Sequence, residues 1–233
     1  MQNNISDTLS RAKESLFPIL GKKIKAEDVC EVDLSIFNSE FDVTDVRTYE
    51  GLEAYINEVL MDNYAKVGMG GYNEHRIVYD KSDHFNEGSV DPRCIHLGID
   101  LWAEVHTAIH APLDGKVHSF KFNNEQLDYG ATIILEHVLE SLTFYTLYGH
   151  LTLNSIKDLK EGQLIKAGEA FTRIGYREEN GGWPPHLHFQ VITNLLGWKG
   201  DFPGVCTERE AQYYMSICPD PKDFVAYYDK QES

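Results

Sequence analysis

Two short stretches of the sequence combine histidine and aspartate at spacings suited to metal binding. The first is His96-Leu97-Gly98-Ile99-Asp100, and the second, much later in the chain, is His186-Leu187-His188. On a strand, side chains two residues apart point the same way, so each stretch would present its polar residues on one face. Two imidazoles and a carboxylate can bind a divalent metal and leave coordination positions open. The two stretches together therefore predict a metal site.

A third histidine motif strengthens this interpretation. His150 stands at the end of a predicted strand, in Tyr148-Gly149-His150-Leu151. The glycine before it would let the backbone bend and let a substrate approach closely. Each motif alone arises often by chance, but all three occur in one strand-rich chain. Their joint presence favours a common site.

The remaining histidines have simpler explanations, because a single histidine on a strand is usually structural or partly exposed. We expect two of them at the surface, two as hydrogen-bonded residues inside strands, and two framing a strand where they could line a groove. In that order, these are His75 and His84, then His118 and His137, then His106 and His110.

The composition is that of an ordinary globular protein, with 42% hydrophobic and 25% charged residues in a chain of 233. A chain of this length can bury a substantial core. Thirteen Tyr, eleven Phe and three Trp favour a fold rich in sheet. The formal net charge of -16 argues against nucleic acid or an anionic membrane as the principal partner.

Cysteine usage and the N-terminus bear on compartment. No two of the four cysteines have the CxxC spacing of a structural zinc knuckle, and spacing leaves open whether Cys206 and Cys218 pair. The first residues lack a basic region followed by an uninterrupted apolar segment. No run is long enough for a transmembrane helix. We therefore expect a cytoplasmic protein, or a periplasmic or extracellular one if a leader has been removed.

Apolar residues at helical spacing predict a mostly helical N-terminal extension over residues 1–70. Residues 5–20 would form a first helix, and Thr48 precedes a second helix that ends at Asp62-Asn63. A strand over residues 31–41 would lie between them. The extension could cover a groove or buttress a sheet, and the sequence leaves both open.

From Gly68-Met69-Gly70-Gly71 onward, the pattern changes to short strands separated by turn-forming residues. Consecutive strands without intervening helices predict an antiparallel assembly over residues 71–196. The predicted strands cover residues 76–79, 95–102, 105–111, 115–122, 131–139, 142–151, a short segment between 162 and 168, and 186–192. Residues 197–233 are expected to form an irregular C-terminal tail packed on the core.

The three histidine motifs occur in the order and approximate spacing of the lysostaphin/LytM-type zinc metallopeptidases, a family of peptidoglycan endopeptidases. Two connecting phrases resemble the same family, Ala108–Val117 (AIHAPLDGKV) and Glu161–Glu169 (EGQLIKAGE). The resemblance covers about residues 90–195, and three motifs in order make it specific.

This resemblance implies a mainly β fold, α+β overall, with an antiparallel sheet or sandwich core. It also implies one Zn2+ per chain, held by His96, Asp100 and His188, with a water completing the site. His150 and His186 then correspond to catalytic histidines that are not ligands. One would take a proton from the metal-bound water and the other would stabilise the oxyanion. We favour His186 as the base, because its strand neighbour His188 would hold it near that water.

Other residues acquire expected roles within this interpretation. Gly98 is a position where a side chain would crowd the metal. Tyr148 and Trp183 could line the wall of a substrate groove, but plain packing is the simpler explanation for each. Gly181-Gly182-Trp183-Pro184-Pro185 would form a rim or lid immediately before His186.

The sequence therefore predicts a zinc metalloendopeptidase acting on peptide bonds in peptidoglycan-type or glycine-containing peptides. One alternative is a zinc hydrolase of a cytoplasmic peptide or amide, which the missing secretion signal motivates. The other is a non-cleaving, metal-containing binding or regulatory module, although the complete set of five site residues argues against it.

Overall fold

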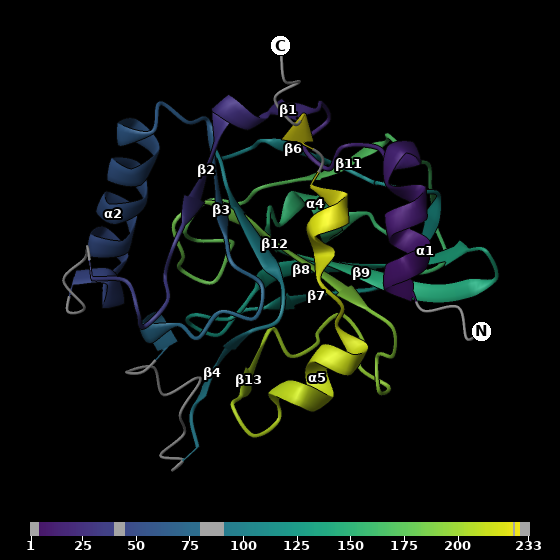
Figure 1. Cartoon of the computed structure of the whole chain (residues 1–233). Coiled ribbons are helices and arrows are strands. Elements are labelled where there is room, and N and C mark those ends of the chain that lie inside the picture. Colours follow the sequence, from purple (N-terminus) through teal and green to yellow (C-terminus); the bar gives the residue numbers. More distant parts are fainter. Residues whose placement is uncertain (1–4, 40–44, 80–90, 226, 229–233) are drawn as a thin grey trace.

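The computed structural model describes residues 5–39, 45–79, 91–225 and 227–228 (Figure 1). Within these ranges the fold is mainly β, as predicted, with helices at its periphery. No helix in them is long and apolar enough to cross a membrane. The four cysteines are buried and free, so Cys206 and Cys218 do not pair.

Eight strands of the described chain form the main sheet, in the order β10-β7-β8-β9-β12-β5-β3-β2. All neighbours are antiparallel except β2 and β3, which run parallel. In sheet order the strands are β10 (Leu164–Ile165), β7 (Gly115–Asn123), β8 (Gly130–Leu139), β9 (Leu142–Leu151), β12 (His186–Ile192), β5 (Ile99–Trp102), β3 (Val67–Gly70) and β2 (Val29–Val32). The predicted antiparallel assembly is confirmed, and two strands from the N-terminal extension continue it.

A tight hairpin joins β8 and β9, which pair along almost their whole length. Its two-residue turn is Glu140-Ser141, and both residues have positive φ, 49° and 68°. Such a turn matches the twist of the flanking strands, which explains why it is favoured in hairpins. The predicted hairpin is confirmed, and it brings His150 at the end of β9 beside β12.

The prediction of one strand over residues 95–102 is wrong in one respect, because the strand is interrupted at Leu97-Gly98. Residues before the break form β4 (Arg93–His96), which pairs with β13 (Val205–Thr207) rather than with the main sheet. The Leu97 N–H donates to the Gly204 carbonyl oxygen (2.8 Å). His96 and Asp100 therefore do not share one strand face, and the bend between β4 and β5 brings them together instead.

The helices differ in how closely they follow the prediction. α2 (Tyr49–Asp62) begins after Thr48, whose side chain accepts from the Gly51 N–H (3.0 Å), as expected of an N-cap. α1 (Ile5–Ala12) is shorter than the helix predicted over residues 5–20 and continues only as the 3₁₀ turn η1 (Lys13–Ser15). The expected strand over 76–79 is wrong, because residues 77–79 form the 3₁₀ turn η4 (Ile77–Tyr79).

Short elements complete the chain. These are β1 (Ile24–Lys25), η2 (Ala26–Asp28), η3 (Asp45–Arg47), β6 (Ala108–His110), α4 (Asn154–Lys157), β11 (Ala170–Arg173), α5 (Ala211–Ile217), η5 (Pro221–Phe224) and β14 (Tyr227–Tyr228). β6 pairs with β11, and β1 with β14. The tail thus contributes a strand, β13, and a helix, α5, as well as irregular segments.

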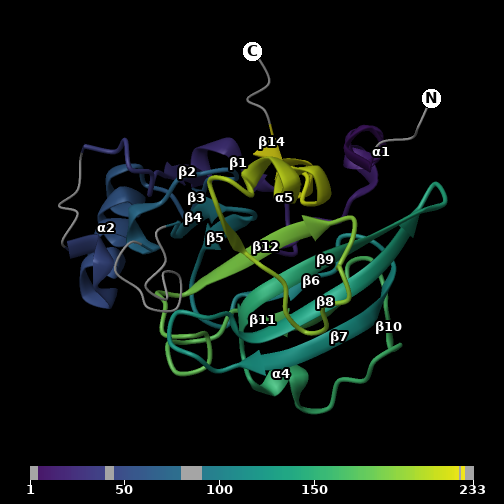
Figure 2. The same cartoon turned by 90° about the horizontal axis from the view of Figure 1, so that it is seen from below.

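The extension and the tail both pack against the sheet. Figure 2 shows α2 beside β2 and β3 at one end of the molecule, and α1 near the tip of the β8–β9 hairpin at the other. There Arg11 pairs with Glu140 (2.7 Å). Leu9 of α1 and Phe224 of the tail join the largest buried apolar cluster with Phe189 of β12. The division into 1–70, 71–196 and 197–233 stays a prediction.

Candidate metal centre

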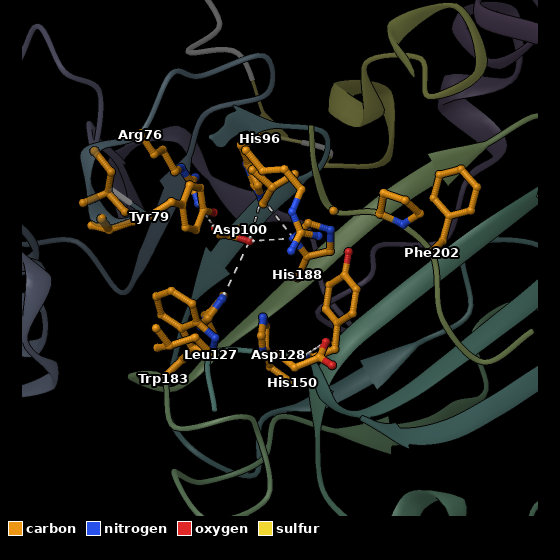
Figure 3. A pocket seen from close by; sticks show the side chains of 18 of the residues that line it. Arg76, Tyr79, His96, Asp100, Leu127, Asp128, His150, Trp183, His188 and Phe202 are labelled. Carbon is orange, nitrogen blue, oxygen red and sulfur yellow. Dashed lines mark hydrogen bonds and ion pairs between the residues drawn. The ribbon is translucent and has the colours of Figure 1, made fainter. Parts of the chain in front are cut away.

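Three ligand-type atoms converge where β4, β5 and β12 meet. His96 Nε2 lies 3.0 Å from His188 Nδ1 and 3.4 Å from Asp100 Oδ1, and the last two atoms are 3.2 Å apart. The three residues are between 1% and 3% exposed. Figure 3 shows their side chains pointing toward one another. The structure therefore brings the three predicted ligands into one cluster that could hold a metal ion.

The sheet register explains part of this arrangement. His188 of β12 stands directly opposite Asp100 of β5. On its other side His188 faces Gly149 of β9, and Asp100 faces Gly70 of β3. Small neighbours on both flanks leave room for the two polar side chains. A Cβ on Gly98 would lie 2.7 Å from His188 Cε1, so the predicted need for a small residue here applies to the ligand ring itself.

Outer hydrogen bonds set the tautomers of both ligand-type histidines. His96 Nδ1 donates to the Gly71 carbonyl oxygen (2.8 Å), which leaves Nε2 with its lone pair. His188 Nε2 donates to Gln190 Oε1 (3.1 Å), which leaves the lone pair on Nδ1. Partners of this kind orient metal-binding imidazoles and raise their basicity. The two free lone pairs both face Asp100 Oδ1.

The donor set fits zinc. Three atoms that carry lone pairs and no proton between them would repel one another at 3.0–3.4 Å unless a cation lay among them. A tetrahedral site with arms of 2.0–2.1 Å has edges of about 3.3–3.4 Å. The observed separations are close to those edges, and two nitrogens with one carboxylate oxygen are ligands that zinc takes.

Asp100 is held from two sides. Its Oδ1 faces the histidines, and its Oδ2 accepts from Arg76 Nη1 (2.5 Å). Although burial alone would raise the pKa of Asp100, the neighbouring His96 and Arg76 hold it well below the usual value. The carboxylate is therefore ionised at neutral pH, as a metal ligand must be.

Two further histidines border the cluster, each with one nitrogen committed to the backbone. His186 Nδ1 donates to the Pro184 carbonyl oxygen and His150 Nδ1 to the Asn180 carbonyl oxygen, both at 2.7 Å. Their Nε2 atoms remain free to exchange protons. His186 Nε2 lies 3.8 Å from Asp100 Oδ1, and the His186 ring centroid is 4.2 Å from that of His150.

Burial keeps these two rings neutral. It lowers the pKa of His186 to about 4 and that of His150 well below its ordinary value, to which the nearby His186 also contributes. His150 has a φ of 61°, an uncommon conformation for a residue other than glycine. The bend predicted from Gly149 therefore falls at His150 itself.

A cavity of about 250 Å³ opens onto the five residues. Its walls come from all parts of the chain: Leu34 and Leu52 of the extension, Trp183 of the loop before β12, and Phe202 and Val205 of the tail. Trp183 does both things considered for it, because it lines the cavity and packs in a buried apolar cluster. Tyr148 is fully buried in the apolar core and does not line the cavity, which agrees with the packing explanation.

The other described histidines do not line the cavity. His110 and His106 do not line it; His110 donates from Nδ1 to the Gly168 carbonyl oxygen, and His106 stacks on Tyr176. His75 is partly exposed beside Glu208. His137 is a buried, hydrogen-bonded strand residue, as predicted. His84 lies outside the described residues.

Two residues near the site escaped the sequence interpretation. Gln190 shares a face of β12 with His186 and His188, so the two-residue period could have identified it. Arg76 gave no such signal, because its contact with Asp100 joins segments that are far apart in the chain. Only the tertiary structure reveals it.

The profile of peptidase family M23 matches residues 94–197. This segment is a little less than half of the chain and contains all five site residues. The match confirms the resemblance to the lysostaphin/LytM-type metallopeptidases and supports a peptidase. No curated protein matches the chain.

Several solved structures are similar to parts of the chain. A zinc-containing peptidase from Vibrio cholerae shares 29% identity over 42% of this chain and 27% of its own, with a TM-score of 0.33. The catalytic domain of lysostaphin from Staphylococcus simulans shares 22% over 52% of this chain and 80% of its own (TM-score 0.36). A putative peptidase M23 from Pseudomonas aeruginosa shares 20% over 57% of this chain and 45% of its own (TM-score 0.36). The chain thus spans about a quarter of the first of these proteins.

Proposed function

We propose that the chain is a zinc-dependent metallopeptidase that hydrolyses peptide or amide bonds, with one zinc ion per chain. The observation that carries this proposal is the convergence of three lone-pair atoms, from His96, Asp100 and His188, beside two histidines with free Nε2 atoms. All five residues face one cavity. Such a constellation combines a metal site with proton-transfer groups.

In this proposal His96 Nε2, Asp100 Oδ1 and His188 Nδ1 are the ligands. Bound zinc would supply an acidified water and would polarise the substrate carbonyl oxygen. Gly71 and Gln190 keep the two imidazoles in the ligand tautomer through their hydrogen bonds to the outer nitrogens.

His186 is the preferred general base and His150 the preferred oxyanion stabiliser. His186 Nε2 is 3.8 Å from Asp100 Oδ1, so a proton taken up there would be stabilised by a nearby carboxylate. The Pro184 carbonyl oxygen holds the opposite nitrogen and fixes the orientation of the ring. His150 is held in the same way by Asn180, and its Nε2 would hydrogen-bond the oxygen that gains charge.

Two classes of substrate are compatible with this proposal: peptidoglycan-type peptides, and a smaller peptide or amide. The family match favours peptidoglycan-type or glycine-containing peptides, because lysostaphin-type enzymes are endopeptidases of that material. The cavity favours a smaller substrate, because the extension and the tail both wall it and the ligand residues are almost fully buried. A short peptide or a simple amide suits such a site better than an extended polymer.

The decisive experiment measures metal content and hydrolysis on the same preparation. Purified protein should bind one zinc per chain and should cleave either purified peptidoglycan or members of a short-peptide library. Release of cell-wall peptides without dipeptide turnover would favour the endopeptidase, and the reverse result would favour the small-substrate hydrolase. A zinc-loaded protein that binds peptides and leaves them intact would identify a non-cleaving module and overturn the proposal.

A further inference from the structure

A chain of hydrogen bonds and ion pairs leads from the N-terminal extension to the proposed metal ligand Asp100. The Leu34 N–H donates to Glu74 Oε1 (3.1 Å). Glu74 Oε2 in turn accepts from Arg76 Nε (2.6 Å), and Arg76 Nη1 donates to Asp100 Oδ2. Arg76 is 2% exposed, so these contacts lie out of water.

Backbone hydrogen bonds also hold Arg76 in place. Its N–H donates to the Cys94 carbonyl oxygen of β4 (2.9 Å), and the residue forms an isolated bridge with Ser35. The Glu74 carbonyl oxygen accepts from the His96 N–H (2.9 Å). Arg76 is therefore anchored to the strand that carries one proposed ligand while its side chain reaches another.

The two oxygens of Asp100 have different partners as a result. Oδ2 is occupied by Arg76, whereas Oδ1 alone faces His96 and His188. A carboxylate can bind a metal through one oxygen or through both. A guanidinium on Oδ2 restricts Asp100 to one oxygen and leaves the remaining coordination positions open.

We propose that Arg76 is the positioning residue of the metal centre: it holds Asp100 so that only Oδ1 is offered to the metal. This inference rests on the proposed function, since it concerns the same site. It also assigns a task to the part of the chain outside residues 94–197, because Leu34, Glu74 and Arg76 all precede that segment.

A purely stabilising role explains the arrangement less well. Arg76 Nη2 is buried without a hydrogen-bond partner. An unpaired buried N–H costs free energy, and a buried ion pair is weak evidence for stability. The planar fork of arginine does, however, suit the bridge from Glu74 to Asp100, with Nε on one carboxylate and Nη1 on the other. The arrangement therefore pairs Asp100 with a guanidinium N–H, although one nitrogen of Arg76 is left without a hydrogen-bond partner.

The test uses the full chain and measures zinc affinity by competition with a chelator. Arg76→Met removes the guanidinium and keeps an unbranched apolar stem of similar course. We expect zinc affinity to fall by about 10–100-fold, the usual effect of losing an outer partner of a ligand. The visible spectrum of the cobalt-substituted protein should also change, because Asp100 is then free to coordinate through both oxygens.

Two companion variants separate positioning from folding. Tyr79→Phe is the matched control, because the Tyr79 hydroxyl accepts from the same Arg76 Nη1 (3.3 Å) but is not bonded to Asp100. Its zinc affinity and cobalt spectrum should stay unchanged. Gly70→Ala keeps every charge, but the new Cβ would lie 2.8 Å from Arg76 Nη2 and so displace the guanidinium. We expect a smaller loss of zinc affinity in this variant.

Each result of these measurements either supports or contradicts the role of Arg76. A folded Arg76→Met protein with the zinc affinity and cobalt spectrum of the unmodified protein would overturn the inference. If that variant does not fold, Gly70→Ala decides, and unchanged zinc affinity there would overturn it equally. Failure of the proposed function is separate, because it appears in the unmodified protein as tight zinc binding without hydrolysis of any peptide.

Discussion

Two buried histidines in this molecule are alike in exposure and in pKa but differ in the chemistry that they can perform. His137 lies on β8, and His186 lies at the start of β12. Both are at most 3% exposed, and burial lowers the pKa of each to about 4. Neither carries a charge at neutral pH.

The difference lies in the second nitrogen of each ring. His137 Nδ1 donates to the Asp114 carbonyl oxygen (3.0 Å), and Nε2 lies 2.8 Å from the Thr146 hydroxyl. His186 commits only Nδ1, to Pro184, and its Nε2 faces the cavity near Asp100. A depressed pKa therefore reports burial at both sites, whereas an uncommitted nitrogen beside a carboxylate and a cavity marks the site capable of chemistry.

The largest expected effect is the loss of zinc affinity when a residue of the proposed ligand cluster is removed. His188→Ala removes one of three donors and should reduce zinc affinity by more than the about 10–100-fold typical of an outer partner. His137→Gln should leave zinc affinity unchanged. Chelator competition on both variants measures the difference, and equal affinities would break the comparison.

The next effect concerns the free nitrogen of His186. His186→Ala should keep stoichiometric zinc and lower kcat by about 10²–10⁴-fold, the range for loss of a general base. His150→Ala should lower it by about 10²–10³-fold, the range for loss of an oxyanion donor. Metal content and steady-state kinetics on the same samples check both values. Loss of zinc from His186→Ala would show that this ring belongs to the ligand set.

A pH experiment tests the structural member of the pair. The folded-state pKa of His137 is about 4, against 6.5 for the unfolded chain, so below pH 6.5 only the unfolded chain gains a proton there. The stability due to neutral His137 is therefore complete above pH 6.5 and is lost as the pH falls toward 4. The full loss amounts to about 3 kcal/mol. In His137→Gln, denaturant unfolding between pH 7 and 4 should show a shallower fall, and parallel curves would contradict the assignment.

Alanine substitution at two glycines compares the proposed ligand His188 with the structural His137. A Cβ on Gly98 would lie 2.7 Å from His188 Cε1, and a Cβ on Gly115 would lie 2.7 Å from His137 Nδ1. Both alanine variants crowd a buried imidazole at the same distance, and each also approaches a backbone carbonyl oxygen, that of Phe189 at 2.7 Å or that of Glu136 at 3.0 Å. Gly98→Ala keeps the ligand and only shifts its ring, so it should lower zinc affinity by about 10-fold, at the low end of the range for a disturbed outer partner, and Gly115→Ala should not change it. Equal effects on zinc would mean that general strain, and not the ligand ring, is responsible.

Local patterns account for most of the secondary structure. The β8–β9 hairpin, β12 and α2 follow from alternation, turn residues and an N-cap, because each depends on residues close together in sequence. The errors arose where distant contacts intervene. The strand is interrupted at Leu97, whose N–H donates to the Gly204 carbonyl oxygen of the tail. Residues 77–79 form a 3₁₀ turn rather than a strand.

The five site residues could be named from the sequence because three short motifs carry them, and the order and spacing of those motifs resemble a known family. Their geometry could not be derived in that way. The opposition of His188 and Asp100, the bend that returns His96 to them, and the hold of Arg76 on Asp100 all join segments from different strands. Sheet register and long-range packing decide such contacts, and neither is encoded in the spacing of nearby residues.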